Sequence, residues 1–157
     1  MSDADLVAFL SSLSRLRDLE IFLLMLDGGL RPGEVLSLQV DDISYGRRRV
    51  VIRKRDDHPR GVRGKSRTER VVDLHEPRTL ETVSRYMMHE RPLDATSPFV
   101  FLVGGNGKRR LEPLSYDAVV RMFAHAWTSS RSADRRPPRM HFGTSTLQRC
   151  GKVGCVS

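Results

Sequence analysis

The stretch GGLRPGEVLSL at residues 28–38 restricts the fold of this chain more than any other, because it forces a break between two apolar segments. Paired glycines commonly end a helix, and a proline is well placed in the first turn of a new one. The sequence therefore predicts that one helix ends at Gly28 and Gly29 and that another begins at Pro32. Arg31 stands at this junction, beside buried packing, where a charged side chain needs either a partner or a function.

Apolar periodicity predicts two helices before this break. Ser2 and Asp5 match the pattern of a capping box, which opens a first helix that runs through about Leu13. A second helix is expected over Leu16–Asp27, and the third starts from Pro32. The positions expected to face the core are Leu19, Phe22, Leu23 and Leu26 in the second helix, and Val35, Leu36 and Leu38 in the third.

A strongly basic segment follows at residues 47–70. It contains eleven Arg or Lys and three Asp or Glu, a balance of +8 that equals the net charge of the whole chain. Strands are expected at 49–53 and 69–74, because runs of valine and isoleucine interrupt the charged residues there. GVRGKS between them supplies turn residues, so Lys65 should lie in or beside the turn of a basic hairpin.

The rest of the chain predicts two more helices with a buried run between them. Pro77 can start a helix that continues to about His89, and Ser115 can cap a helix over about 116–129. FVFLV at 99–103 is expected as a short strand or an extended buried run. The apolar positions of the two helices are Leu80, Val83, Met87, Val119, Val120, Phe123 and Trp127.

These elements predict an α+β, mainly helical fold, in which a small antiparallel β-sheet, with room for a third strand, packs on a helical bundle. The predicted organisation is one domain over residues 1–130, followed by a linker and an irregular tail over 131–157. A hydrophobic content of 39% with 29% charged residues is typical of a globular chain.

Charge and the remaining motifs exclude several classes of function. The net charge of +8 indicates an anionic partner, either nucleic acid or an acidic membrane surface. The membrane is discounted because there is no basic amphipathic helix and the longest apolar run, at 21–26, is too short to cross a bilayer. With no N-terminal signal, a cytoplasmic location is expected. Cys150, Cys155 and His141 form too weak a pattern for a zinc site, and no metal or cofactor is expected.

In their order along the chain, these motifs resemble the catalytic domain of the tyrosine recombinases, also called phage-type integrases. G-L-R-P-G-E-V-L-S-L at 29–38 is similar to the family's first catalytic box, a Gly-Leu-Arg-x-x-Glu-hydrophobic-x-x-Leu run. D-D-I, the hairpin G-K-S-R-T-E-R-V-V-D-L and the later F-V-F-L and P-L-S-Y-D-A-V-V-R-M-F are similar to the next family elements in the same order. The resemblance covers about residues 3–128.

The resemblance implies DNA strand cleavage and rejoining without metal or ATP. In this family a tyrosine attacks a DNA phosphodiester, forms a covalent 3′-phosphotyrosine and releases a 5′-hydroxyl, and the reverse step joins a different strand. Arg31 suits the negative charge that builds on the phosphoryl oxygens, because its planar guanidinium can hold two of them and stays charged. The alternative is that Arg31 neutralises the C-terminal carbonyl groups of the preceding helix.

The resemblance also assigns roles to residues around Arg31. Lys65 corresponds to the hairpin lysine that protonates the departing 5′-oxygen, although a single surface lysine often serves only solvation. Glu34, three residues after Arg31, is expected to pair with it and hold its rotamer rather than to transfer protons. The arginines expected to hold the DNA phosphate backbone are Arg63, Arg67 and Arg70.

The sequence departs from the family after Trp127. The family pattern requires a His-x-Leu-Arg-His box, then a second His or Trp, then the nucleophilic Tyr, but residues 136–157 read RPPRMHFGTSTLQRCGKVGCVS. His141 does not have the family's spacing to an arginine. Tyr45, Tyr86 and Tyr116 lie too early in the chain and are expected to be core or surface aromatics. The polypeptide is therefore expected to be an inactive fragment, since covalent catalysis needs the attacking group.

A frameshift near residue 135 would account for this departure. If a new triplet begins at the third base of each codon for residues 136–143, the shifted frame can encode Thr-Pro-His-Ala-Leu-Arg-His. This is the missing box with its usual Thr-Pro lead. The tail is accordingly expected to be non-native, a hypothesis that the coding DNA tests. The chain also begins where the family's catalytic domain begins, without the N-terminal domain that clamps the duplex, so weak and mostly non-specific DNA affinity is expected.

Two classes of function remain. The first is site-specific recombination or integration by an enzyme of a phage or mobile element, with double-stranded DNA and other recombinase protomers as partners. The second is a non-catalytic basic module that binds nucleic acid through its hairpin, with a structural Arg31. They differ in one geometric respect: the recombinase interpretation requires that Arg31 and Lys65 approach one cleft.

Overall fold

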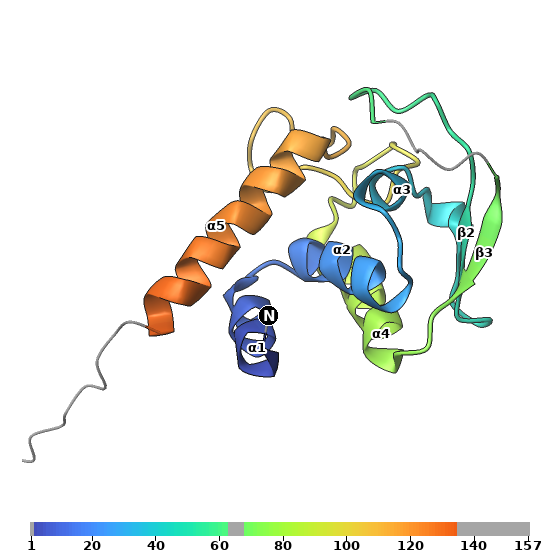
Figure 1. Ribbon diagram of the computed structural model, residues 1–157. Helices are drawn as coiled ribbons and strands as arrows, with labels where there is room; N and C mark the ends of the chain where they lie inside the picture. Colours follow the sequence, from blue (N-terminus) through green and yellow to red (C-terminus); the bar gives the residue numbers. More distant parts are fainter. Residues whose placement is uncertain (1, 63–67, 135–157) are drawn as a thin grey trace, which may run out of the picture.

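The structure is a computed structural model that describes residues 2–62 and 68–134. Its elements are α1 (Asp3–Ser12), α2 (Leu16–Asp27), α3 (Pro32–Leu36), a 3-10 turn η1 (Val40–Asp42), β1 (Ile43–Ser44), β2 (Arg49–Ile52), β3 (Arg70–Asp73), α4 (Pro77–Arg85), a π-helical turn η2 (Tyr86–Glu90) and α5 (Tyr116–Asp134). Figure 1 shows the sheet on one side and α1 with α5 on the other, with α2, α3 and α4 between them. The fold is mixed and mainly helical, as predicted.

The two helices before the glycine pair begin and end close to where the sequence predicts. At the start of α1 the Ser2 hydroxyl accepts a hydrogen bond from the Asp5 N–H at 3.2 Å, and the Asp5 carboxylate accepts one from the Ser2 N–H at 3.0 Å. This is the predicted capping box. The bounds of α2, Leu16–Asp27, are those expected.

The buried face of α2 is wider than predicted. Leu23 is buried as expected, but the prediction for Leu26 is wrong, because 57% of its surface is exposed. Ile21 and Leu24 lie in the main core instead, and Glu20 is fully buried beside them. The reason is that α2 packs against α4 and α3 on one side and against the α1–α5 pair on another, so its buried surface spans two faces and leaves Leu26 outside.

Gly28 and Gly29 end α2 for two different steric reasons. A Cβ on Gly28 would lie 2.3 Å from Cδ1 of Leu30 and 2.9 Å from the carbonyl oxygen of Leu24, so no side chain fits there. Gly29 has a φ of 60°, which glycine adopts at no steric cost. Pro32 then opens α3, as predicted, and the chain between the two helices is reduced to a short turn.

The β-strands form one antiparallel sheet in the order β1–β2–β3. β2 and β3 fall inside the predicted ranges 49–53 and 69–74, and β1 is the third strand for which the prediction left room. Val50 and Ile52 of β2 point into the core, whereas Val71 of β3 is 57% exposed, because side chains alternate between the two faces of a strand. The sheet therefore covers the core with one face.

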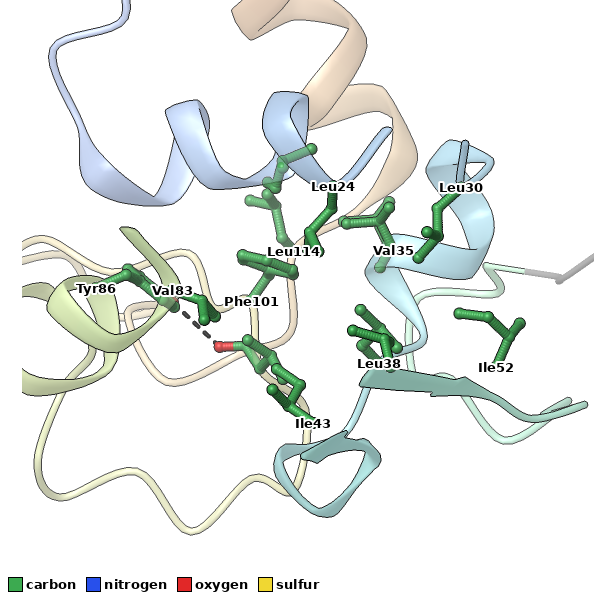
Figure 2. Close-up of a cluster of buried hydrophobic side chains, with 14 of the residues drawn as sticks. Leu24, Leu30, Val35, Leu38, Ile43, Ile52, Val83, Tyr86, Phe101 and Leu114 are labelled. Carbon is green, nitrogen blue, oxygen red and sulfur yellow. Dashed lines mark hydrogen bonds between the residues drawn. The ribbon is translucent and has the colours of Figure 1, made fainter. Parts of the chain in front are cut away.

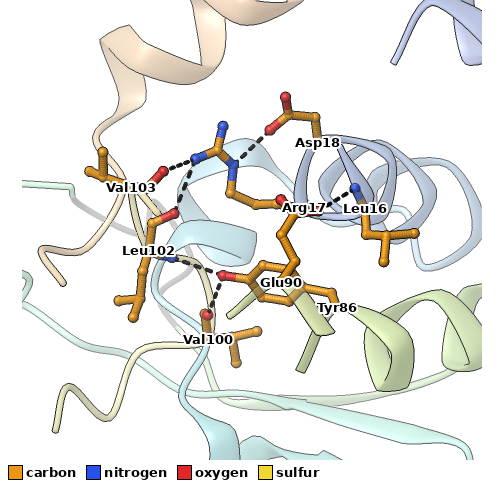
Figure 3. Close-up of polar contacts among 8 residues, drawn as sticks. All are labelled: Leu16, Arg17, Asp18, Tyr86, Glu90, Val100, Leu102 and Val103. Carbon is orange, nitrogen blue, oxygen red and sulfur yellow. Dashed lines mark hydrogen bonds and ion pairs between the residues drawn. The ribbon is translucent and has the colours of Figure 1, made fainter. Parts of the chain in front are cut away.

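The run FVFLV at 99–103 forms an extended buried segment and is not one of the strands of the sheet. Val100 N–H donates to the Leu38 carbonyl at 2.9 Å, and Phe101 is fully buried. The Tyr86 hydroxyl donates to the Val100 carbonyl at 3.1 Å and accepts from the Leu102 N–H at 3.2 Å (Figure 3). Figure 2 shows this run in the core that α2, α3 and the sheet enclose.

Polar side chains tie the start of α2 to the same run. The Arg17 guanidinium forms an ion pair of 2.6 Å with Asp18 and donates to the carbonyl oxygens of Leu102, at 3.2 Å, and Val103 (Figure 3). These groups are buried, so the contacts satisfy charges and carbonyls that water does not reach. The arrangement fixes α2, and with it the turn that carries Arg31, relative to the buried run.

The last helix differs from the prediction in length and orientation. α5 continues to Asp134, five residues past the predicted end, so the region predicted as linker and tail, 131–157, begins inside a helix. Val119 is buried, but Val120 and Trp127 are 48% and 38% exposed, against the prediction of one apolar stripe facing the core. α5 contacts the body mainly through a small cluster around Phe9, so only a narrow face is covered. Within residues 2–62 and 68–134, no helix is long and apolar enough to cross a bilayer.

Candidate functional site

Arg31 caps the N-terminus of α3 with its backbone and leaves its side chain exposed. Its φ and ψ of −76° and 150° are extended, as is usual at a helix N-cap. Its carbonyl accepts a hydrogen bond from the Val35 N–H at 3.0 Å, and its N–H donates to Oε2 of Glu34 at 2.9 Å. The residue is thus held at its backbone, while the guanidinium stays on the surface.

Glu34 does not pair with the guanidinium of Arg31, as the sequence predicted, but with that of Arg70. Oε2 of Glu34 lies 2.9 Å from Nη2 of Arg70, and the Glu34 side chain is only 3% exposed. The difference arises because β3 brings Arg70 beside α3, a contact that local spacing does not reveal. Glu34 therefore links the Arg31 backbone to the sheet, and its negative charge is balanced by Arg70.

A pocket of about 550 Å³ opens beside this turn. Its walls come from three segments distant in sequence, and the lining residues are Arg31, Pro32, Gly33, Glu34, Gly61, Val62 and Tyr116. The exposed guanidinium of Arg31 gives it a positive charge, since the carboxylate of Glu34 is already paired. The geometry suits an anion with a body larger than a simple ion.

Tyr116 is the pocket residue that the sequence reasoning missed. It was expected to be a core or surface aromatic, and it is indeed 49% exposed, yet it lines the same pocket as Arg31. As the first residue of α5, directly after the capping Ser115, it had a predictable place in the secondary structure. The signal that would have revealed its position is tertiary, because 85 residues separate it from Arg31.

The described arginines of the basic segment are largely paired with acids. Asp42, which is 1% exposed, binds Arg55 through both carboxylate oxygens and lies 3.3 Å from Nε of Arg53. The other pairs are Arg49 with Asp73 and Arg60 with Glu112. Much of the basic segment's charge therefore serves to hold the sheet and its following loop against the helices.

Lys65, Arg63 and Arg67 lie outside the described residues, as do His141, Cys150 and Cys155. Gly61 and Val62, which directly precede residues 63–67 in the sequence, form part of the pocket wall. Lys65 therefore stays a prediction. No group of three or more His, Cys, Asp or Glu side chains within the described ranges could hold a metal ion.

Two buried titratable groups lie away from the pocket lining. Burial, with the nearby charge of Asp27 adding to it, raises the pKa of Glu20 to about 9. Burial lowers the pKa of His58, whose Nδ1 accepts a hydrogen bond from the Arg60 N–H at 3.1 Å and whose ring meets Phe99 edge-on. Both groups are therefore uncharged at neutral pH, and neither adds charge to the pocket.

The helical fold with its small sheet, and the arginine at the start of a helix beside a basic hairpin, define a class of protein: this chain belongs to the phage integrase family, the tyrosine recombinases, whose family pattern it matches over residues 3–143. The resemblance inferred from the sequence is therefore confirmed. Transposase A from transposon Tn554 of Staphylococcus aureus is 32% identical over 107 residues, which is 66% of this chain and 28% of the transposase. The chain thus spans little more than a quarter of that relative.

Solved structures confirm the fold. A crystal structure of XerA recombinase superposes with a TM-score of 0.65 at 16% identity, covering 83% of this chain and 42% of the recombinase. The Tn1549 transposon integrase, in complex with a circular intermediate DNA, superposes with a TM-score of 0.64 at 17% identity, covering 89% of this chain and 48% of the integrase. The α+β architecture predicted from the sequence is that of these recombinase chains.

Proposed function

We propose that this chain supplies part of the catalytic site of a site-specific tyrosine recombinase that acts on double-stranded DNA, and that the Arg31 pocket receives the phosphodiester. One observation carries the proposal: an exposed guanidinium, fixed at its backbone, stands at a pocket whose only other charged lining residue within the described ranges is a paired glutamate. A preorganised cation of this kind stabilises charge that develops on phosphoryl oxygens without a cost of reorganisation.

In the proposed chemistry, a tyrosine oxygen attacks phosphorus, the bond from phosphorus to the 5′-oxygen breaks, and a proton must reach the departing oxygen. Arg31 holds the non-bridging oxygens, and Lys65 donates the proton. Glu34 and Arg70 position the turn that carries Arg31. Arg63 and Arg67 bind flanking phosphates, which adds salt-dependent affinity without base specificity.

DNA as the partner is supported by the related structures, since the Tn1549 transposon integrase was solved in complex with circular intermediate DNA. Recombination joins strands of two sites, so other recombinase protomers are partners in the same proposal. We also propose that the activity takes place in the cytoplasm.

We also propose that the 157-residue polypeptide binds DNA without cleaving it. It contains three tyrosines, of which Tyr86 is buried with its hydroxyl engaged by backbone groups and Tyr45 does not line the pocket. No His-x-Leu-Arg-His box occurs in its sequence. Covalent strand transfer by this polypeptide would therefore need groups supplied from another chain. This observation is also what favours the alternative function, a non-catalytic DNA-binding module.

The test compares Arg31→Ala with Arg85→Ala, which removes the same charge from an exposed position on α4. Binding to a short DNA duplex is measured by fluorescence anisotropy at several salt concentrations. We expect Arg31→Ala to weaken binding about tenfold and to lower the slope of log affinity against log salt by about one, as one phosphate contact predicts. Arg85→Ala should stay within about twofold of the unmodified protein.

Equal behaviour of the two variants would contradict the proposed role of Arg31 and leave only general electrostatic binding. A second assay mixes the protein with a nicked duplex that traps covalent intermediates, followed by denaturing electrophoresis. We expect no protein–DNA adduct from the polypeptide alone. An adduct would overturn the proposal that it does not cleave, while it would support the recombinase chemistry.

A further inference from the structure

We propose that Tyr116 binds the same phosphodiester as Arg31, with its phenolic O–H donating a hydrogen bond to a non-bridging phosphoryl oxygen. The inference rests on the proposed function and adds a residue that the sequence comparison did not assign. It makes Tyr116 a phosphate-binding residue, not the attacking nucleophile. The geometry of the start of α5 and the charge of the pocket support it.

The backbone around Tyr116 is held firmly in place. Leu114, which is 3% exposed, donates its N–H to the Phe101 carbonyl at 3.0 Å. Ser115 caps α5, since its Oγ accepts from the Ala118 N–H at 3.3 Å and its carbonyl accepts from the Val119 N–H at 3.3 Å. Val119 is anchored in the core at 2% exposure. The backbone at Tyr116 is therefore fixed before a ligand binds, and binding has to order only the side chain.

The hydroxyl of Tyr116 differs from those of the other two tyrosines. The Tyr86 hydroxyl is already hydrogen-bonded to the Val100 carbonyl and the Leu102 N–H inside the core (Figure 3). Tyr45 is 43% exposed but lies at the turn between β1 and β2, outside the pocket lining. Within the described ranges, Tyr116 is the tyrosine that lines the Arg31 pocket and makes no hydrogen bond through its hydroxyl.

The charges of the pocket favour an anion, but Arg31 does not satisfy every acceptor position of a bound phosphodiester. Arg31 provides a positive guanidinium, whereas Glu34 is held by Arg70 and by the Arg31 N–H and does not repel a phosphate strongly. A phosphodiester has two non-bridging oxygens with several acceptor positions. A neutral phenolic donor can satisfy one of these without adding charge, which is a common mode of contact between tyrosine and DNA phosphates.

The size of the pocket favours a phosphate within a polynucleotide over a free phosphate ion. A volume of about 550 Å³ exceeds the space that one phosphate fills and leaves room for a flanking sugar, against which the Tyr116 ring can pack. The ligand class is therefore a phosphodiester of DNA. Inorganic phosphate should compete only weakly, because it would leave most of the pocket empty.

The experiment uses Tyr116→Phe, which removes only the hydroxyl, with Tyr45→Phe as the matched control at a similarly exposed tyrosine. Affinity for a short DNA duplex is measured by anisotropy across a range of salt concentrations. We expect Tyr116→Phe to weaken binding three- to tenfold with no change in the salt slope, because a neutral donor releases no counterion. Tyr45→Phe should bind like the unmodified protein. Added inorganic phosphate should displace DNA only at concentrations that also raise the ionic strength of the solution.

The double variant Arg31→Ala with Tyr116→Phe tests whether both residues act on one phosphate. If they do, the combined loss is smaller than the product of the single losses, because the phosphate is already misplaced in Arg31→Ala. Multiplicative losses would overturn the shared-phosphate inference. Unchanged affinity of Tyr116→Phe, beside a weakened Arg31→Ala, would overturn the inference and leave the proposed function intact.

Two further outcomes are also decisive. If neither Arg31→Ala nor Tyr116→Phe weakens binding, the proposed function and the inference fall together. If the unmodified protein forms a covalent adduct with a nicked duplex and Tyr116→Phe does not, Tyr116 is a nucleophile and its assignment as a hydrogen-bond donor is overturned. Circular dichroism of each variant tests whether the fold is kept, which is expected because the Tyr116 ring is half-exposed.

Discussion

Two buried glutamates, one in the turn that carries Arg31 and one in the middle of α2, show how differently the same side chain can be used. Glu34 is 5% exposed, and its carboxylate accepts from the Arg31 N–H and pairs with Arg70. Glu20 is fully buried, and neither of its carboxyl oxygens has a hydrogen-bonding partner among the described residues. Burial raises the pKa of Glu20 to about 9, so it is protonated at neutral pH.

Burial of an acid therefore does not by itself mark a functional site. Glu34 has partners that compensate its loss of water, and those partners connect it to an exposed cation at a pocket. Glu20 lies in an apolar environment and avoids the cost of desolvation by keeping its proton. Partners, rather than depth of burial, distinguish Glu34, which lines the Arg31 pocket, from Glu20, whose burial lowers stability at high pH.

The largest expected effect is a dependence of stability on pH that originates at Glu20. In the unfolded chain this carboxyl ionises near its ordinary pKa of 4.5, whereas in the folded protein it keeps its proton up to about pH 9. Its raised pKa therefore gives a contribution that is fully present below pH 4.5 and is lost as pH rises toward 9. We expect the free energy of unfolding to fall by about 4 kcal/mol from about pH 5 to about pH 8.

Glu20→Gln should abolish this dependence, because the amide cannot ionise. Urea unfolding followed by circular dichroism should find the variant similar to the unmodified protein near pH 5 and more stable near pH 8. His58 contributes with the opposite sign, since its lowered pKa means that stability is lost as pH falls below its ordinary value of 6.5. That contribution is common to both proteins and cancels in the difference. Parallel pH curves for the two proteins would contradict the assignment.

The second prediction concerns Glu34, where loss of the side chain should be costly at any pH. Glu34→Ala removes the acceptor of the Arg31 N–H and the partner of Arg70 together. We expect the free energy of unfolding to fall by about 2 kcal/mol, and DNA affinity to fall about fivefold because the Arg31 turn is held less firmly. Glu34→Gln keeps an oxygen that accepts from the Arg31 N–H, so its stability should lie between those of Glu34→Ala and the unmodified protein. A fully stable Glu34→Ala would show that the turn is fixed by its own geometry.

The contrast also separates what the sequence could predict from what it could not. The ends of α2, the start of α3 at Pro32 and the strands of the sheet depend on capping, glycine and proline, and local alternation, and all were predicted to within a few residues. Burial of Glu20 was not predicted, because a glutamate inside a helix is normally read as a solvent-facing position. Only the packing of α2 on two sides places it inside.

The candidate site follows the same division. Arg31 and Glu34 were predicted from a motif that is contiguous in the chain. The pairing of Glu34 with Arg70 spans 36 residues, and the presence of Tyr116 at the pocket depends on contacts over 54 or more residues. Sequence spacing encodes neither. Composition predicted a positive surface, yet it could not show that Asp42 and Glu112 form ion pairs that neutralise part of that charge.

The smallest expected effect comes from Arg70, which the sequence assigned to the DNA backbone and the structure pairs with Glu34. Its side chain is 44% exposed, so solvent screens the pair, and Arg70→Ala should lower the free energy of unfolding by only about 1 kcal/mol. Glu34 keeps the Arg31 N–H as a partner in that variant. Urea unfolding near neutral pH measures the change, with Arg85→Ala as the control for loss of an exposed charge.

The salt dependence of DNA binding then decides between the two roles of Arg70. An arginine that neutralises a phosphate releases counterions, so its removal lowers the slope of log affinity against log salt by about one. Because the charge of Arg70 is already compensated by Glu34, we expect Arg70→Ala to change the slope by much less than Arg31→Ala does. A full unit of slope would mean that Arg70 exchanges Glu34 for DNA on binding, and the buried carboxylate would then depend on the Arg31 backbone alone.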